Sequence, residues 1–316
     1  MRTPVSIGVV GDLPRAAALV DALEHLPQAE VRWVCSERRG SEPSPLRRGV
    51  RHTTTFRDLL DDEHVDAVMI AAPTAARSEL AVSALAADKH VYVAGVPAQT
   101  AAQAEHLLRT ARRRGRCFFS DDAGRFDPVV GKLADLTRSG ELGEVLYVHT
   151  ERRVPALEEV AAEELALVLR LLRDEPISVS AWRESYVDSA AADLLDIRLS
   201  FATGIVARLS LTTLDARSGS TCAVVGTTAT AVVENGVLAV HSKDGSVLCP
   251  CVPAADAVRC GCESFLAAVR SLDAASQDAE AVAVLEVLDH VQRSLKRGGS
   301  VDVAQPKPEP ELRVVG

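Results

Sequence analysis

Short apolar runs alternate with amphipathic helical segments through the N-terminal part of the chain. Near-continuous hydrophobicity, typical of strands buried on both faces, occurs at 5–10, 31–35, 65–72, 90–94 and 116–120. Helical spacing falls between several of these runs, at 15–26, 80–87 and 101–114. Repeated strand–helix–strand units with right-handed crossovers build a parallel sheet. The sequence therefore predicts a Rossmann-like domain over residues 1–123.

The pattern changes after Arg125. Helices are expected at 128–139 and 157–172, and short alternating strands at 145–150, 193–201, 205–211, 222–225, 229–233 and 237–240. Two more helices, at 263–272 and 278–295, carry apolar residues at helical spacing and are expected to cover one face of the resulting sheet. These features predict an α/β fold. Its second α/β domain, over 124–303, has an open, mainly antiparallel sheet, and the Pro-rich segment 304–316 is expected to be a flexible tail.

Charge and hydropathy exclude several classes of partner. The chain has 316 residues and a formal net charge of -9, and this acidic excess argues against nucleic acid because phosphate recognition needs a basic surface. No run has the length of a membrane span, and the first residues lack the features of a signal peptide. We therefore expect a cytoplasmic protein without a membrane partner, which acts on a small molecule or a partner protein.

Four of the seven cysteines are clustered, as Cys249-Pro-Cys251 and Cys260-Gly-Cys262. Two close thiol pairs could supply the four soft ligands of a tetrahedral zinc site. The C-x-C spacing is less diagnostic than C-x-x-C, so the favoured interpretation is that these are small residues beside a loop, with no metal. The other cysteines lie in apolar runs and are expected in the core, at positions 35, 117 and 222.

The first predicted strand ends at Gly11-Asp12-Leu13-Pro14-Arg15-Ala16, where a dinucleotide-binding fold has the G-x-G-x-x-G/A motif. Gly11 is retained and Ala16 is acceptable, but Leu13 replaces the glycine that lets the backbone approach the pyrophosphate. A branched side chain there should crowd the phosphates. If a dinucleotide binds, this turn would contact it through Gly8, Gly11 and Leu13.

The second predicted strand is followed by Ser36, Glu37, Arg38 and Arg39. An NAD-binding domain has an acidic residue near this point for the ribose hydroxyls, whereas serine and arginine suit a 2′-phosphate. Ser36, Arg38 and Arg39 therefore favour NADP over NAD, although these arginines could equally belong to a solvated loop and no cofactor need bind. The end of the strand at 65–72 completes the candidate cofactor site with Ala72, Pro73 and Thr74.

Several motifs occur in the order found in one known family. They are Asp66-Ala67-Val68-Met69-Ile70-Ala71-Ala72-Pro73-Thr74, Lys89-His90-Val91-Tyr92-Val93, Arg125-Phe126-Asp127-Pro128, Ser139-Gly140-Glu141-Leu142-Gly143-Glu144-Val145 and Phe265-Leu266-Ala267-Ala268-Val269-Arg270. With them the chain resembles, over nearly its whole length, the glucose-fructose oxidoreductase, inositol dehydrogenase and MocA (Gfo/Idh/MocA) family. The resemblance implies a nicotinamide dinucleotide in the first domain. It also implies a homo-oligomer assembled through the open C-terminal sheet.

The chain departs from this family at the positions that carry the chemistry. The family's lysine near nicotinamide and substrate corresponds to Gly95, and its aspartate and histidine on the helix at 157–172 correspond to Val160 and Glu164. Hydride transfer at an alcohol carbon needs a partner for the hydroxyl proton. Valine cannot serve, and Glu164 belongs to an acidic set that predicts a solvated helix face. Lys89 begins its strand at the edge away from the ligand crevice and should not substitute.

Another pair of acidic residues, Asp121 and Asp122, ends a predicted strand at the carboxyl edge, where ligands bind in parallel sheets. Adjacent strand residues point to opposite faces, so one of the two is expected to face the cavity. Asp122 is kept as a candidate catalytic residue beside Glu164, with loop capping as the alternative.

Three functions remain. The favoured one is a redox-inactive relative that acts as a binding or partner subunit, because three chemical positions are lost together with Leu13. The second is an atypical NADPH-dependent reductase of a small carbonyl, sugar or imine, which uses Glu164 or protons derived from the substrate. The third is a non-redox enzyme that reuses the cleft between the domains.

Overall fold

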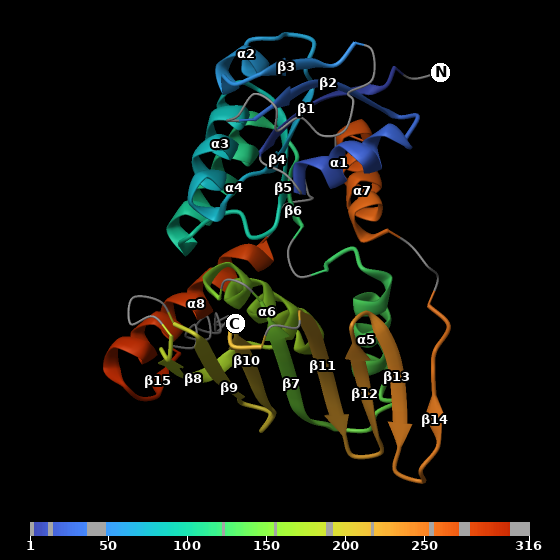
Figure 1. Cartoon of the computed structure of the whole chain (residues 1–316), viewed down its shortest axis with the longest axis vertical. Helices are drawn as coiled ribbons and strands as arrows, with labels where there is room; N and C mark the ends of the chain where they lie inside the picture. Colours follow the sequence, from blue (N-terminus) through green and yellow to red (C-terminus); the bar gives the residue numbers. More distant parts are fainter. Residues whose placement is uncertain are drawn as a thin grey trace, which may run out of the picture.

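Two α/β domains lie one above the other along the long axis of the molecule (Figure 1). The computed structural model describes residues 3–11, 15–36, 49–121, 124–154, 157–187, 192–215, 218–252, 256–271 and 279–303. No helix in these ranges is both long and apolar enough to cross a bilayer.

The N-terminal domain contains a six-stranded sheet in the order β3-β2-β1-β4-β5-β6, and its recorded strand pairs are parallel. Its strands are β1 (Val5–Gly11), β2 (Ala29–Cys35), β3 (Arg51–Thr53), β4 (Ala67–Ala71), β5 (His90–Ala94) and β6 (Phe118–Asp121). Its helices are α1 (Arg15–Glu24), α2 (Phe56–Leu60), α3 (Thr74–Ala86) and α4 (Ala101–Arg114). The predicted Rossmann-like sheet is confirmed. The sequence analysis missed β3 and α2, because three and five residues are too few to show a periodicity.

Local sequence signals determine where the helices begin and end. At the start of α4, Thr100 and Gln103 form a capping box, and Gly115 ends the helix with a left-handed φ of 60°. At the start of α5 (Pro128–Ser139), the side chain of Asp127 accepts a hydrogen bond from the Val129 amide at 2.7 Å. These two helices begin and end where the sequence predicts.

The C-terminal domain contains a nine-stranded sheet in the order β14-β13-β12-β11-β7-β10-β9-β8-β15. Its strands are β7 (Val145–Arg153), β8 (Pro176–Glu184), β9 (Leu194–Phe201), β10 (Val206–Thr212), β11 (Gly219–Gly226), β12 (Ala229–Glu234), β13 (Val237–Ser242), β14 (Val247–Leu248) and β15 (Val301–Asp302). The pairing of β10 with β7 is parallel and the other recorded pairs are antiparallel. The predicted mainly antiparallel sheet is confirmed. Helices α5, α6 (Glu158–Leu172) and α8 (Ala279–Arg297) pack on one face (Figure 1).

Helix α7 (Ala257–Ser271) corrects one prediction about the fold. It does not cover the C-terminal sheet with α8 but packs on α1, in the core of the N-terminal domain (Figure 1). There the ring of Phe265 lies 5.6 Å from that of Tyr92 and 5.7 Å from that of Phe119. The apolar face of a helix indicates that this face is buried, but it does not indicate which of the two domains the helix packs against.

The cysteine pairs do not meet as a metal site. No group of three or more potential metal ligands occurs among the described residues. Cys260 and Cys262 are two positions apart on α7, so their side chains point in nearly opposite directions. Cys262 lies in the core, where burial raises its pKa to about 12. The expected burial of Cys35, Cys117 and Cys222 is confirmed.

Candidate active site between the domains

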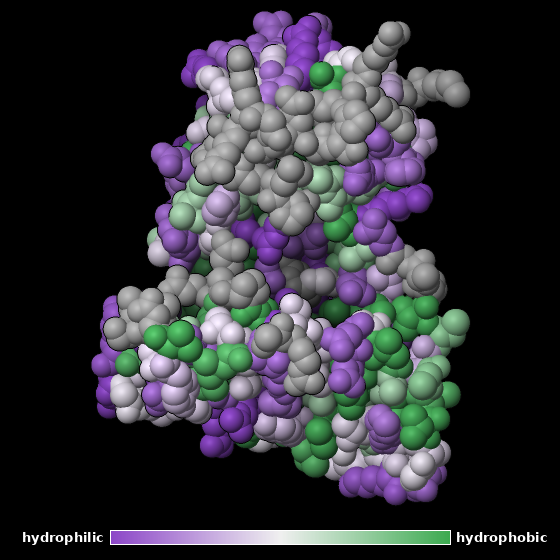
Figure 2. Space-filling view, viewed as in Figure 1, coloured by the Kyte–Doolittle hydropathy of each residue, from purple (hydrophilic) through white to green (hydrophobic). Residues whose placement is uncertain are grey.

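A cavity of about 370 Å³ lies between the two domains. One wall is the first part of α1 with the ends of β5 and β6, and the other includes α5, α6, β7 and β11. The carboxyl ends of parallel strands are where ligands bind in open α/β sheets. Figure 2 shows a hydrophilic recess at this level, at the waist of the molecule.

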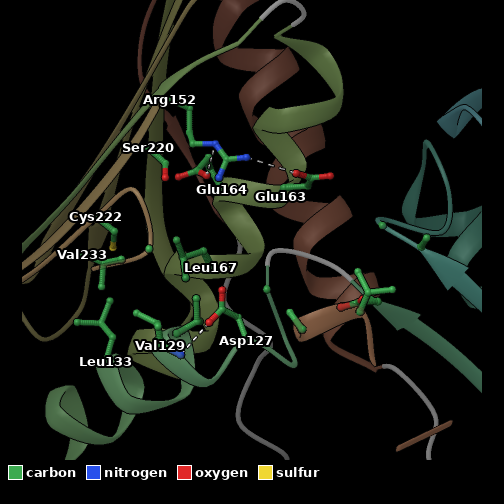
Figure 3. Close-up of a pocket in the computed structure, with 18 of the residues that line it drawn as sticks. Asp127, Val129, Leu133, Arg152, Glu163, Glu164, Leu167, Ser220, Cys222 and Val233 are labelled. Atoms are coloured by element: carbon green, nitrogen blue, oxygen red, sulfur yellow. Dashed lines mark hydrogen bonds and ion pairs between the residues drawn. The ribbon is translucent and has the colours of Figure 1, made fainter. Parts of the chain in front are cut away.

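Glu164 lies in this cavity, contrary to the expectation of a solvated helix face. Its side chain is only 3% exposed and points toward Arg152 of β7, whose Nε lies 3.5 Å from Oε1 (Figure 3). The acidic run in the sequence was misleading because α6 packs against the sheet and α8 on one side and borders the interdomain cavity on another. The periodicity of apolar residues reveals the helix face that packs against the sheet and α8, but it does not reveal the face that borders the cavity.

Burial raises the pKa of Glu164 above its ordinary value, and this effect outweighs the lowering by the guanidinium of Arg152. The carboxyl group therefore keeps its proton to a higher pH than an exposed glutamate does. Glu163, on the same helix, contributes a smaller effect in the same direction. Such a group can donate a proton in the cavity and leave a carboxylate that Arg152 stabilises.

Arg152 lies between the two carboxyl groups of α6, with Nη2 3.9 Å from Oε2 of Glu163 (Figure 3). Glu163 also contacts the other domain, because Nη2 of Arg15 on α1 donates a hydrogen bond to its Oε1 at 3.3 Å. An ionic network thus crosses the cavity from α1 to β7.

Asp121 is the acidic residue of β6 that lines the cavity. The hydroxyl of Tyr92 donates a hydrogen bond to its Oδ2 at 2.6 Å. Burial raises the pKa of Asp121, although this hydrogen bond and Arg125 oppose the shift. The predicted candidate Asp122 lies outside the described residues. Alternation along the strand indicates that one of the two faces the cavity, but it does not say which.

Gly95 lines the cavity where the family resemblance places a lysine, and its φ of +107° is one that side chains rarely adopt. A Cβ there would lie 2.8 Å from Nη1 of Arg77. Arg77 is fully buried and donates hydrogen bonds to the carbonyls of Ala72, at 2.8 Å, and Val96, at 2.9 Å. A guanidinium therefore occupies the space beside Gly95. The sequence analysis missed Arg77, since one arginine in a helical segment is usually solvated.

Val160, the position that the family resemblance pairs with an aspartate, packs against the hydrophobic core and cannot move a proton. Lys89 donates hydrogen bonds to the carbonyls of Asp62, at 3.0 Å, and Val65, at 2.8 Å. These contacts tie it to the segment that precedes β4, at the far edge of the sheet, as the sequence predicted.

Of the candidate cofactor residues that the structure describes, Gly8 lies within β1, and the others lie at or just after the ends of β1, β2 and β4. At Gly11 a Cβ would overlap the Ala71 carbonyl, and at Gly8 it would overlap Leu59, so packing accounts for both glycines. The hydroxyl of Ser36 lies 3.0 Å from Nε2 of His52. Pro73 and Thr74 begin α3, and the carbonyl of Ala72 contacts Arg77. Leu13, Arg38 and Arg39 lie outside the described residues.

The cavity walls fit the nicotinamide half of a dinucleotide. Ala94, Gly95 and Leu19 give the wall of the N-terminal domain a small or apolar surface, and Leu133 and Leu167 line the other wall. A flat ring needs two such apolar surfaces with polar groups at the edge. Arg15, Arg152 and Glu164 supply those polar groups.

Comparison with known proteins is consistent with this description. Residues 5–121 match the model of the oxidoreductase family with an NAD-binding Rossmann fold, GFO_IDH_MocA. The chain is 29% identical over 151 residues to an inositol 2-dehydrogenase from Salmonella paratyphi B, which covers 46% of this chain and 43% of that protein. By sequence, the match therefore spans less than half the length of that relative.

Two solved structures share the fold over nearly the whole chain. One is a variant of a 3-ketoreductase from Actinomadura kijaniata in complex with TDP-benzene and NADP, with a TM-score of 0.84, 22% identity, and coverage of 93% of this chain and 98% of that chain. The other is GenD2 from gentamicin A biosynthesis in complex with NAD, with a TM-score of 0.79, 20% identity, and coverage of 96% and 98%.

The fold thus defines an NAD(P)-binding oxidoreductase architecture, with a Rossmann domain followed by an open-sheet domain. By sequence, the N-terminal domain matches the Gfo/Idh/MocA family over residues 5–121, as the motifs in that part of the chain predicted.

Proposed function

We propose that the protein is an NADPH-dependent reductase of a small carbonyl, sugar or imine substrate, with Glu164 as the proton donor. The burial of Glu164 in the cavity, beside Arg152, carries this proposal. A solvated glutamate would be ionised at neutral pH, whereas a buried one can hold a proton there. The similarity to an inositol 2-dehydrogenase and to a 3-ketoreductase supports a polyhydroxylated or keto substrate.

The bound cofactor would supply the hydride, and the side chains of the cavity would manage the proton. Glu164 would donate its proton to the oxygen or nitrogen of the substrate, and Arg152 would stabilise the carboxylate that remains. Asp121 would orient a polar group of the substrate from the opposite wall, since Tyr92 fixes its carboxyl group.

A calorimetric titration of the purified protein with NADPH and NADH tests the proposal. We expect micromolar binding of NADPH and weaker binding of NADH, because Ser36, Arg38 and Arg39 suit a 2′-phosphate. Turnover with a panel of ketones, keto sugars and cyclic imines then identifies the substrate. The absence of binding by either dinucleotide would contradict the proposal.

The absence of a lysine at Gly95 favours a second candidate function. The guanidinium of Arg77 and the φ of Gly95 exclude a side chain there, and Val160 is apolar. A redox-inactive binding or partner subunit would need none of the missing groups. A protein that binds neither NADPH nor NADH would be this subunit.

We also propose that the open face of the C-terminal sheet binds a second copy of the chain. Trp182 on this face is 48% exposed and lines a shallow hollow with Tyr147 and Arg208. A large, exposed aromatic side chain beside an arginine is typical of an interface anchor. Trp182→Glu should raise the dissociation constant of the oligomer by about 30-fold or more, the effect of losing a hot spot of ~2 kcal/mol.

Analytical ultracentrifugation of the wild type and this variant measures the change. Trp182→Phe, which keeps an aromatic ring, is the control and should remain associated. A wild-type protein that is monomeric at all concentrations would contradict the proposal.

A further inference from the structure

We propose that Arg15 binds the diphosphate of the dinucleotide and that Glu163 holds the guanidinium in place until the diphosphate arrives. The inference rests on the proposed function, since it assigns a phosphate ligand within the same cavity. Arg15 is outside the glycine motif, so the pattern of that motif gives it no role.

Position is the first argument. Arg15 is the first residue of α1, four positions after the last residue of β1, and lines the cavity between the domains. Its side chain is 45% exposed and reaches Glu163 of the other domain, with 3.3 Å between Nη2 and Oε1. The guanidinium is therefore directed across the cavity and not along the surface of its own helix.

Compensation is the second argument. The chain has Leu13 where a glycine would let the backbone approach the phosphates. A long cationic side chain two positions further along the chain, such as that of Arg15, can reach phosphates that lie farther from the backbone. A guanidinium also pairs with two phosphate oxygens at once, which a single backbone amide cannot do.

The exchange leaves no carboxylate without a partner. Glu163 lies 3.9 Å from Nη2 of Arg152 as well as 3.3 Å from Arg15. When Arg15 turns to a diphosphate, Glu163 keeps Arg152. A diphosphate, with one negative charge on each of its two phosphates, competes with one carboxylate for the same guanidinium, so the exchange favours the bound state.

Calorimetric titration with NADPH, before any assay of activity, tests the role of Arg15. Arg15→Ala should weaken binding by about 10- to 100-fold, the effect of losing a charge-assisted hydrogen bond to a charged group. Arg57→Ala is the matched control, because Arg57 is an exposed arginine that pairs with Asp61 at 2.9 Å on α2, away from the cavity. This control should bind as the wild type does.

Two more measurements separate the diphosphate from other contacts. ADP-ribose 2′-phosphate, which has the diphosphate but no nicotinamide, should show the same loss with Arg15→Ala. Glu163→Gln should bind NADPH at least as tightly as the wild type, since it removes the competing carboxylate. The assignment would be overturned if Arg15→Ala lost affinity for NADPH but not for ADP-ribose 2′-phosphate. It would also be overturned if Glu163→Gln bound NADPH as weakly as Arg15→Ala does.

The failures are distinguishable. A wild type that binds no dinucleotide would overturn both the proposed function and the role of Arg15. Equal binding by the wild type and Arg15→Ala would overturn the role of Arg15 alone. Thermal melting of each variant confirms that the comparison is made on folded protein.

Discussion

Gly95→Lys should lower the free energy of unfolding by about 3–5 kcal/mol, since it combines a strained backbone conformation with overpacking. The φ of +107° is unfavourable for any side chain, and the new Cβ would lie 2.8 Å from Nη1 of Arg77. Arg77 cannot move away without breaking its hydrogen bonds to Ala72 and Val96. Urea denaturation, followed by circular dichroism, measures the change.

A double-mutant cycle with Arg77→Met separates the two causes. Arg77→Met alone should cost about 3 kcal/mol because it leaves two buried carbonyl groups without their donor. The double variant should cost less than the sum of the single variants by about 1–2 kcal/mol, because the methionine gives the lysine room. If the change in the free energy of unfolding of the double variant equals the sum of those of the two single variants, the contact with Arg77 does not contribute to the cost of Gly95→Lys. The cycle also predicts that Gly95→Lys alone does not restore a family-type site.

Glu164→Gln should reduce the second-order rate constant for reduction by about 100-fold or more, the usual contribution of a positioned general acid. In the wild type the rate should fall as the pH rises through the raised pKa of Glu164, because the donor loses its proton. The variant should lack this decline. Steady-state kinetics with NADPH and the substrate found in the panel, measured over a range of pH, gives both results.

Glu163→Gln is the control for Glu164→Gln, since it removes a neighbouring carboxylate and leaves the proposed donor in place. It should change the affinity for the dinucleotide and keep the decline in rate at high pH. If it abolishes the decline while Glu164→Gln does not, the donor is misassigned.

The pH dependence of the free energy of unfolding tests the raised pKa of Glu164 without any substrate. Its pKa is raised in the folded state, so the folded protein binds the proton more tightly than the unfolded chain. The resulting stabilisation is complete below the ordinary pKa of glutamate and is lost as the pH rises through the raised one. The free energy of unfolding of the wild type should therefore decline over this range more than that of Glu164→Gln.

Most of the fold follows from local patterns. Strands β1, β4 and β5 were predicted from continuous apolar runs, because a strand that is buried on both faces has apolar residues at successive positions. Strands β9 and β10 were predicted from alternating runs, because a strand that is buried on one face has apolar residues at every second position. The sequence analysis also missed β8, although its inward-facing residues alternate with polar ones. Its bulge near Pro176 and exposed Trp182 disturb the alternation.

The site was less predictable than the fold, because it depends on contacts between domains. Resemblance to the family directed attention to Gly95 and Glu164, and both line the cavity. The environment of Glu164, however, depends on a cavity shared with α1 and β7. Arg77 is far from Gly95 in sequence and meets it only through the packing of α3 on β5. Neither contact produces a periodic pattern.

The position of α7 has a consequence for how the protein is made on the ribosome. Translation completes β6 at Asp121, but α7 begins only at Ala257, after nearly all of the C-terminal sheet. Until then the nascent N-terminal domain exposes the apolar surface around Tyr92 and Phe119 that Phe265 later covers. Domains usually fold in the order of their synthesis. Here the N-terminal domain cannot be completed until most of the second domain has been translated.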